Sequence, residues 1–221
     1  MQFTRITLVD PESALSNIAN ATAYGHHQQI WSFFAGDPDG ERGFVYRYDA
    51  ERQPTFHVVS DREPTHALPG WRVESRAYTP RLEMGAVLRF SLRANPTKRV
   101  ASPGERSDGK RHDVVMAAKH QLKAKGEAFD LQALVQDEGI RWLERQGERH
   151  GFSVERGNVR VDDYRPHRFR RPRDGREMSV TGIDYEGRLK VTDSEAFTEA
   201  LCKGIGPAKG FGFGLLMVKR A

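Results

Sequence analysis

The sequence predicts an α+β fold with antiparallel sheets. Short apolar segments with the alternation of strands recur along the whole 221-residue chain. They are separated by a few longer segments in which apolar residues recur at helical spacing. Both halves of the chain also show the same order of elements, in which a strand is followed by a helix and two more strands.

The first half of the chain begins with a strand. Residues 2–9 alternate between apolar and polar side chains, as a half-buried strand does. Thr22 is a suitable N-cap for a helix over residues 23–34, because Ile30 and Trp31 recur there at helical spacing with other apolar residues. Further strands are predicted at residues 44–48, 55–59 and 87–92.

Residues 101–110 separate this half from the next. Ser, Gly, Pro and charged residues dominate the segment, which is typical of a loop between domains because such residues leave little to bury. Beyond it, one helix is predicted at residues 131–149 and another, capped by Ser194, at residues 194–203. The remaining predicted strands cover residues 152–161, 178–185, 188–191 and 213–218.

The shared element order predicts two tandem ferredoxin-like (RRM-like) domains. We assign residues 1–100 to an N-terminal domain that carries the first helix, residues 101–129 to a loop or linker, and residues 130–221 to a C-terminal domain. No residue pattern recurs between the halves, so the repeat depends on element order. Domains of this kind serve as enzymes, as RNA-binding modules and as structural subunits, and the fold does not choose among them.

Composition limits the partners and the sites. The chain has 35 Lys and Arg residues against 30 Asp and Glu residues, a formal net charge of +5. This favours an anionic partner such as nucleic acid, although a solvated basic surface gives the same excess. Cys202 is the single cysteine, which excludes an intramolecular disulfide and a cysteine-based zinc site. No apolar run approaches the roughly 20 residues that span a bilayer, so we expect a cytoplasmic protein without membrane contact.

A basic segment over residues 165–176 gives the most concentrated signal for nucleic acid. Asp174-Gly175 is a hairpin-turn dipeptide and predicts a projecting β-ribbon, which could enter the groove of a structured RNA and bind its phosphates. A solvated loop is the alternative, and we favour RNA binding. Six arginines lie in these twelve residues: Arg165, Arg168, Arg170, Arg171, Arg173 and Arg176.

A glycine-rich segment over residues 204–214 is the second candidate for phosphate binding. Glycines such as Gly206 and Gly210 let a backbone approach a phosphate closely, and Lys209 adds a positive charge. The segment is not a P-loop, because it lacks the Gly-Lys-Ser/Thr ending and lies between a predicted helix and a strand. A turn that only lets these two elements pack closely is an equal alternative.

The pair His26-His27 on the first predicted helix is the third candidate. His27 is four residues before Trp31, so it lies on or beside the apolar stripe, where a packing role is more common than catalysis. Tyr24 lies one turn earlier on the same face. A metal site is not expected, because adjacent histidines point about 100° apart on a helix and no further ligand stands at a suitable spacing.

Four sequence blocks together resemble one family, the CRISPR repeat-RNA endonucleases called CasE of type I-E Cascade systems. The blocks follow one another in the family's order and span nearly the whole chain. They are Tyr-Gly-His-His-Gln-Gln-Ile-Trp at residues 24–31, Leu-Arg-Phe-Ser-Leu-Arg-Ala-Asn-Pro-Thr-Lys at 88–98, Ile-Arg-Trp-Leu at 140–143, and Gly-Ile-Gly-Pro-Ala-Lys-Gly-Phe-Gly-Phe-Gly-Leu-Leu at 204–216.

The resemblance implies a fold and an activity. The fold is a tandem ferredoxin-like one, and the activity is cleavage of precursor CRISPR RNA at the 3′ base of the repeat hairpin without metal or cofactor. The products are a 2′,3′-cyclic phosphate and a 5′-hydroxyl. The mature guide RNA stays bound, the partners are other Cascade subunits, and the free protein is expected to be monomeric. Arg93 and Lys98 of the second block are expected to contact RNA.

The resemblance also assigns the catalytic residues. The family's histidine falls on His27 and its tyrosine on Tyr24, which reverses the weighting given above to a packing role. A histidine can accept a proton from a 2′-hydroxyl or donate one to the leaving 5′-oxygen, and the sequence does not choose between these roles. Several members carry a basic residue five positions after the histidine, where this chain has Ser32. A non-catalytic RNA-binding subunit therefore remains the alternative.

Overall fold

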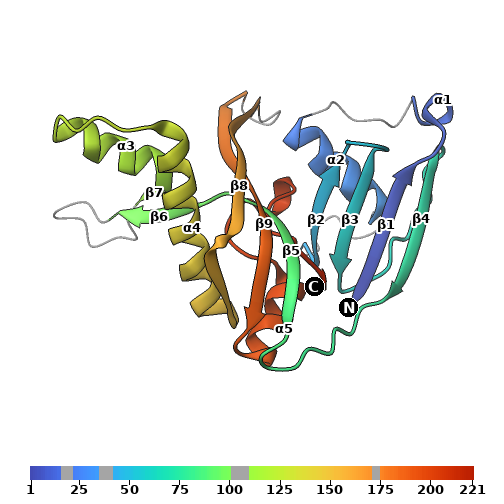
Figure 1. Ribbon diagram of the computed structural model, residues 1–221. Coiled ribbons are helices and arrows are strands. Elements are labelled where there is room, and N and C mark those ends of the chain that lie inside the picture. The colour runs from blue at the N-terminus through green and yellow to red at the C-terminus, as the bar shows by residue number, and fades with distance from the viewer. Residues whose placement is uncertain (16–21, 35–41, 101–109, 171–174) are drawn as a thin grey trace.

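The computed structural model describes residues 1–15, 22–34, 42–100, 110–170 and 175–221. Two four-stranded antiparallel sheets lie side by side (Figure 1). Their strand orders are β2-β3-β1-β4 and β10-β5-β9-β8. In each sheet the two central strands are the first and the third of its strands in chain order, as in a ferredoxin-like sheet. The predicted α+β class and the tandem ferredoxin-like fold are confirmed.

Helix α2 covers one face of the first sheet. Ile30 and Phe33 of this helix are fully buried against Phe44, Phe56 and other side chains of the sheet. Thr22 caps the helix as predicted. The unit consists of β1 (Gln2–Leu8), α1 (Pro11–Ala14), α2 (Ala23–Phe33), β2 (Phe44–Asp49), β3 (Thr55–Ser60) and β4 (Trp71–Ala77).

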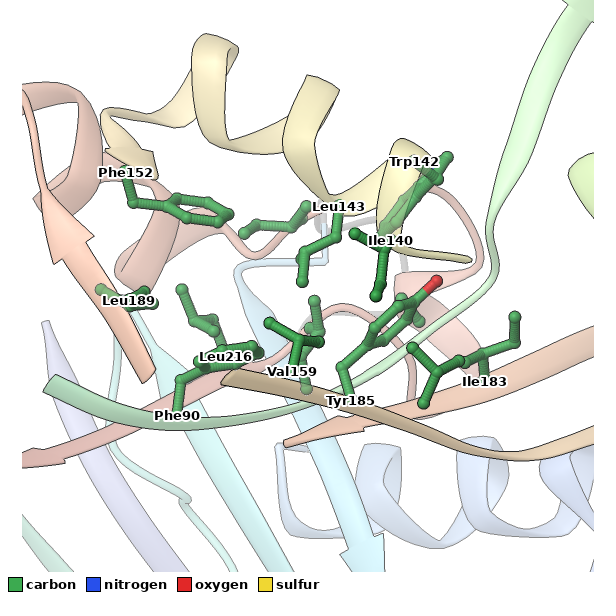
Figure 2. Close-up of a cluster of buried hydrophobic side chains, with 14 of the residues drawn as sticks. Phe90, Ile140, Trp142, Leu143, Phe152, Val159, Ile183, Tyr185, Leu189 and Leu216 are labelled. Atoms are coloured by element: carbon green, nitrogen blue, oxygen red, sulfur yellow. The ribbon is translucent and has the colours of Figure 1, made fainter. Parts of the chain in front are cut away.

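The second sheet is covered by two helices. Its elements are β5 (Val87–Ala94), α4 (Leu131–His150), β8 (Phe152–Arg170), β9 (Glu177–Val191), α5 (Ser194–Lys203) and β10 (Leu216–Arg220). Figure 2 shows Ile140, Trp142 and Leu143 of α4 directed at side chains of the sheet such as Tyr185. Trp142 stacks on Tyr185 with 5.9 Å between ring centroids. Through this cluster, α4 packs on one face of the second sheet.

Strands β8 and β9 form one long hairpin that rises beside α2 (Figure 1). The basic segment is its distal half, and Arg170 pairs in register with Glu177 just before the tip, so the predicted β-ribbon is confirmed for the described residues. The strands predicted at 178–185 and 188–191 are one strand, because Glu186 and Gly187 stay paired with β5. The register shifts between Asp162 and Arg165.

The sheets divide at a different place from the predicted boundary near residue 101. Strand β5 belongs to the second sheet, so the chain crosses between sheets over residues 78–86. The segment predicted as a loop or linker over 101–129 contains β7 (Lys110–Asp113) and α3 (Val114–Ala124), and β7 pairs with β6 (Thr97–Val100). Residues 101–109 lie outside the described ranges. Because β5 precedes β6 and already belongs to the second sheet, the boundary between the units lies before β5.

Smaller differences from the predictions have local causes. Strand β4 was missed because it is an edge strand with mostly exposed side chains. The cap of α5 is Asp193, whose carboxylate accepts from the N–H groups of Glu195 and Ala196, and Ser194 is the first helical residue. The last strand begins at Leu216 because Phe213 belongs to the preceding loop. No helix in the described ranges is long and apolar enough to cross a membrane.

Candidate active site

Helix α2 places Tyr24 and His27 at the rim of the first core. The Thr22 hydroxyl oxygen accepts a hydrogen bond from the Gly25 N–H at 3.0 Å, which fixes the first turn. Ile30 is fully buried, and His27 lies one turn before it on the same face. The imidazole is therefore half-buried: it packs on the helix and keeps one side accessible.

A backbone carbonyl of the C-terminal loop holds the His27 ring. Nδ1 lies 2.7 Å from the carbonyl oxygen of Gly210, and the Tyr46 hydroxyl donates to the same oxygen at 3.2 Å. A carbonyl oxygen only accepts hydrogen bonds, so Nδ1 must carry a hydrogen. In the neutral ring, Nε2 then keeps its lone pair and can accept a proton.

The environment keeps the His27 ring neutral. Burial lowers the pKa of His27 below 6.5, the hydrogen bond to Gly210 raises it, and the positive charge of Arg42 lowers it again, with a net decrease. A neutral imidazole at pH 7 is the form that a general base requires. The geometry and the charge therefore favour proton acceptance at Nε2.

An aromatic cluster joins the helix, the hairpin and the C-terminal loop. The Tyr24 ring lies 5.9 Å from that of His27 and stacks on Phe169 of β8 at 6.2 Å, measured between centroids. Phe211 of the loop lies 5.5 Å from His27 and 4.8 Å from Phe169. The distal part of the basic hairpin thus packs through Phe169 on Tyr24, and Phe211 joins Phe169 to His27.

Glycines of the C-terminal loop approach other groups closely. A methyl group on Gly210 would lie 2.6 Å from Nη1 of Arg42 and 3.6 Å from Nδ1 of His27. Gly206 has φ +77°, and a methyl group there would lie 3.0 Å from the Trp142 ring, so this position is excluded to other residues by conformation and by space. The short 3₁₀ helix η1 (Lys209–Phe211) follows.

An open pocket of about 410 Å³ lies beside His27. The described residues that line it are His27, Arg42 and residues 206–211, which include three basic side chains and no acidic one. Burial and the nearby charges of Arg42 and Lys203 lower the pKa of Lys209. A positive group that lowers the pKa of a neighbouring lysine favours an anion beside them. The predicted residues His27, Gly206, Lys209 and Gly210 are brought together here, and the pocket suits a phosphate.

Arg42 was missed by the sequence analysis. It lies fifteen residues after His27, in no recognised motif, and reaches the pocket from the start of β2. Burial lowers the pKa of its guanidinium. Tyr46, on β2, was missed for the same reason. No signal in the sequence alone identifies either residue, because only the packing of β2 against the C-terminal loop brings them to His27.

Two of the predicted RNA-binding arginines have carboxylate partners. Arg93 donates from Nε and Nη2 to the carboxylate of Asp184 at 2.8 and 2.7 Å, and from Nη1 to the Tyr48 carbonyl at 3.0 Å. Because Tyr48 is in the first sheet, Arg93 links the two sheets. Arg165 pairs with Asp163 at 3.0 Å. The charge of each is offset within the protein.

The other predicted basic residues lie on the hairpin and on a second projection. Arg168 and Arg170 are exposed on β8 and have no ion pair within the described residues. Arg176 is exposed beyond the tip, and Arg171 and Arg173 lie outside the described ranges. Lys98 is on β6, across α4 from α2 (Figure 1), so it is not part of the pocket.

His26 is turned away from the pocket. Its ring lies 3.9 Å from the Tyr48 ring, between centroids, so it packs on the first sheet. Among the described residues, no three His, Cys, Asp or Glu side chains gather in an arrangement that could hold a metal ion.

Comparison with known proteins gives consistent results over the whole chain. A model of the family described as CRISPR associated protein matches residues 1–220. The CRISPR-associated endoribonuclease Cse3 of Thermus thermophilus is 34% identical, with 99% of both chains covered. The Cascade subunit CasE of Escherichia coli K12 is 29% identical, with 87% of this chain and 89% of that protein covered. A structure of Cse3 bound to a 19-nucleotide RNA has a TM-score of 0.72 at 28% identity, with 99% of this chain and 98% of that chain covered.

Proposed function

The chain belongs to the family of CRISPR associated proteins, and on that basis we propose that it is the endoribonuclease that matures CRISPR RNA. It binds the stem-loop of the repeat, cleaves the precursor at the 3′ base of the stem and retains the product as a subunit of a Cascade complex in the cytoplasm. The names of two similar proteins, an endoribonuclease and a Cascade subunit, support this proposal.

The single observation that carries the catalytic proposal is the hydrogen bond from Nδ1 of His27 to the Gly210 carbonyl. It directs Nε2 away from the loop with its lone pair available, and the lowered pKa keeps the ring neutral. We assign His27 as the general base that takes the proton of a ribose 2′-hydroxyl. Tyr24, one turn away, is assigned to hold an oxygen of the scissile phosphate.

The reaction needs no metal in this mechanism. The 2′-hydroxyl gives its proton to Nε2, and the 2′-oxygen attacks the adjacent phosphorus. The bond from phosphorus to the 5′-oxygen then breaks, and this oxygen takes a proton from water. The products are a 2′,3′-cyclic phosphate and a 5′-hydroxyl, and charge on the phosphate is stabilised by the basic pocket beside His27.

RNA binding is assigned to the hairpin and to the C-terminal loop. Arg168 and Arg170, exposed and without a carboxylate partner in the described ranges, are assigned to phosphates of the stem. Lys209 is assigned to the phosphate at the cleavage site. Arg93, which pairs with Asp184, supports the fold of the RNA-binding surface and contributes less to affinity.

Cleavage of the repeat RNA by a His27→Ala variant tests the proposal. In buffer containing EDTA, the unchanged protein should cut the repeat at one position. The variant should bind the hairpin with similar affinity and cut it at least about 100-fold more slowly. A repeat with a 2′-deoxyribose on the 5′ side of the cleaved bond should stay intact with both proteins.

The matched control is His120→Ala, which removes an exposed histidine on α3 and should cut like the parent. The product ends are identified by mass, because a cyclic phosphate is lighter by one water than a linear one. Cleavage by the His27 variant at the parental rate would exclude the general base. Loss of parental cleavage in EDTA alone would exclude the metal-free reaction, and absence of cleavage with and without EDTA would leave RNA binding as the alternative.

A further inference from the structure

Arg42 supplies a positive charge to the pocket of His27 that helix α2 does not provide. The helix contains no lysine or arginine over its length. Ser32 is exposed, and its hydroxyl donates to the Gln28 carbonyl of the same helix at 3.2 Å. Any positive charge at the cleavage site must therefore come from another element.

The position of Arg42 is set by its contact with the loop that holds His27. Nη1 would lie 2.6 Å from a methyl group placed on Gly210, so the guanidinium lies against the Gly210 backbone, whose carbonyl accepts from His27. Both side chains line the same open pocket. A phosphate beside Nε2 of His27 would thus be within reach of the guanidinium.

No acidic group of the described residues offsets this charge. The pocket is lined by no Asp or Glu, and Arg42 makes no ion pair with any residue in the described ranges. Arg47 and Arg93, by contrast, have carboxylate partners at 2.8 and 2.7 Å. Arg42 is exposed, and a guanidinium that no described carboxylate binds is free to pair with an anion from outside.

We propose that Arg42 is a catalytic residue whose guanidinium binds the non-bridging oxygens of the scissile phosphate and stabilises the charge of the pentavalent intermediate. The proposal rests on the proposed endoribonuclease function. A planar guanidinium can donate two parallel hydrogen bonds to the oxygens of one phosphate. Lys209, which lines the same pocket, adds a second charge.

Single-turnover cleavage by Arg42→Ala and Arg42→Lys tests this role. We expect Arg42→Ala to bind the hairpin within about threefold of the parent but to cut it on the order of 100-fold more slowly. Arg42→Lys keeps the positive charge but loses the two parallel hydrogen bonds that a guanidinium can donate. Its cleavage rate should therefore be about tenfold higher than that of Arg42→Ala. The matched control is Arg72→Ala, an exposed arginine on the edge strand β4, which should behave like the parent.

The pH dependence of the rate separates charge from folding. Arg42 lowers the pKa of His27, so the midpoint of the pH–rate profile should move to higher pH in Arg42→Ala and stay unchanged in Arg42→Lys. Parental rates for Arg42→Ala, together with an inactive His27→Ala, would overturn the role of Arg42 and leave the function standing. Failure of the parent to cleave would overturn both proposals.

Discussion

Replacing His26 by phenylalanine should make the fold less sensitive to acid. The His26 ring lies against the rings of Tyr48 and Phe56. Burial first, and then the charges of Arg93 and His167, lower its pKa from 6.5 to about 4. Phenylalanine keeps the aromatic contacts and cannot be protonated, and the His26 ring donates and accepts no hydrogen bond within the described residues.

The expected loss of folding stability follows from the pKa of His26 in the folded and in the unfolded protein. In the unfolded chain His26 regains a pKa near 6.5, so the unfolded state binds this proton more tightly than the folded state. The stability that depends on a neutral ring is fully present above pH 6.5 and is lost as the pH falls toward 4. At about 1.4 kcal/mol per pKa unit the full effect is about 3 kcal/mol, of which about 2 kcal/mol is lost by pH 5.

Urea unfolding at pH 7 and pH 5 measures this difference. Between these pH values the parent should lose about 2 kcal/mol more free energy of unfolding than His26→Phe, because all other titrating groups are shared. His120→Phe, at an exposed position of α3, is the control and should follow the parent. Equal losses for parent and His26→Phe would refute the reasoning, since the folded protein would then accept the proton without cost.

Two further predictions concern the loop and the hairpin. Gly210→Ala places a methyl group 2.6 Å from Arg42 and should slow cleavage at least about tenfold with little effect on RNA affinity. The control is Gly157→Ala, where a methyl group meets nothing within 4 Å. Equal cleavage rates for the two variants would contradict the close packing of Gly210 against Arg42. Replacing both Arg168 and Arg170 by alanine should reduce the slope of log affinity against log salt by about two units. An unchanged slope in binding titrations would show that the hairpin does not contact phosphates.

The element types were predictable because local patterns determine them. The strand at the N-terminus and helix α2 follow from alternation, spacing and the Thr22 cap, and the hairpin follows from a turn signal between two β-rich runs. The division of the sheets was not predictable from the same signals. A polar segment looks the same whether it joins two units or lies within an insertion, and the decisive pairing of β5 with β9 joins residues about a hundred positions apart.

The pocket beside His27 was predictable in part. His27 and Lys209 stand in sequence blocks that resemble a family, and the structure brings both to one pocket. Arg42 belongs to no block, and its role depends on a contact with a loop far along the chain. Arg93 shows the opposite case, since a basic residue in a matched block is paired with Asp184. Charge in the sequence therefore identifies candidates, and carboxylate partners in the fold decide which of them are available to RNA.

The hydrogen-bond partner of His27 explains how an oriented imidazole and two positively charged side chains share one pocket. A carboxylate at Nδ1 would also fix the ring with Nε2 accessible, but it would raise the pKa of the imidazole and place a negative charge beside the phosphate. The neutral Gly210 carbonyl fixes the ring without that charge. The pocket can then keep Arg42 and Lys209 unneutralised, and Gly210 is the residue that brings its carbonyl to His27 while leaving room for the guanidinium. In the proposed mechanism, orientation of the base and stabilisation of the phosphate thus depend on the same backbone position.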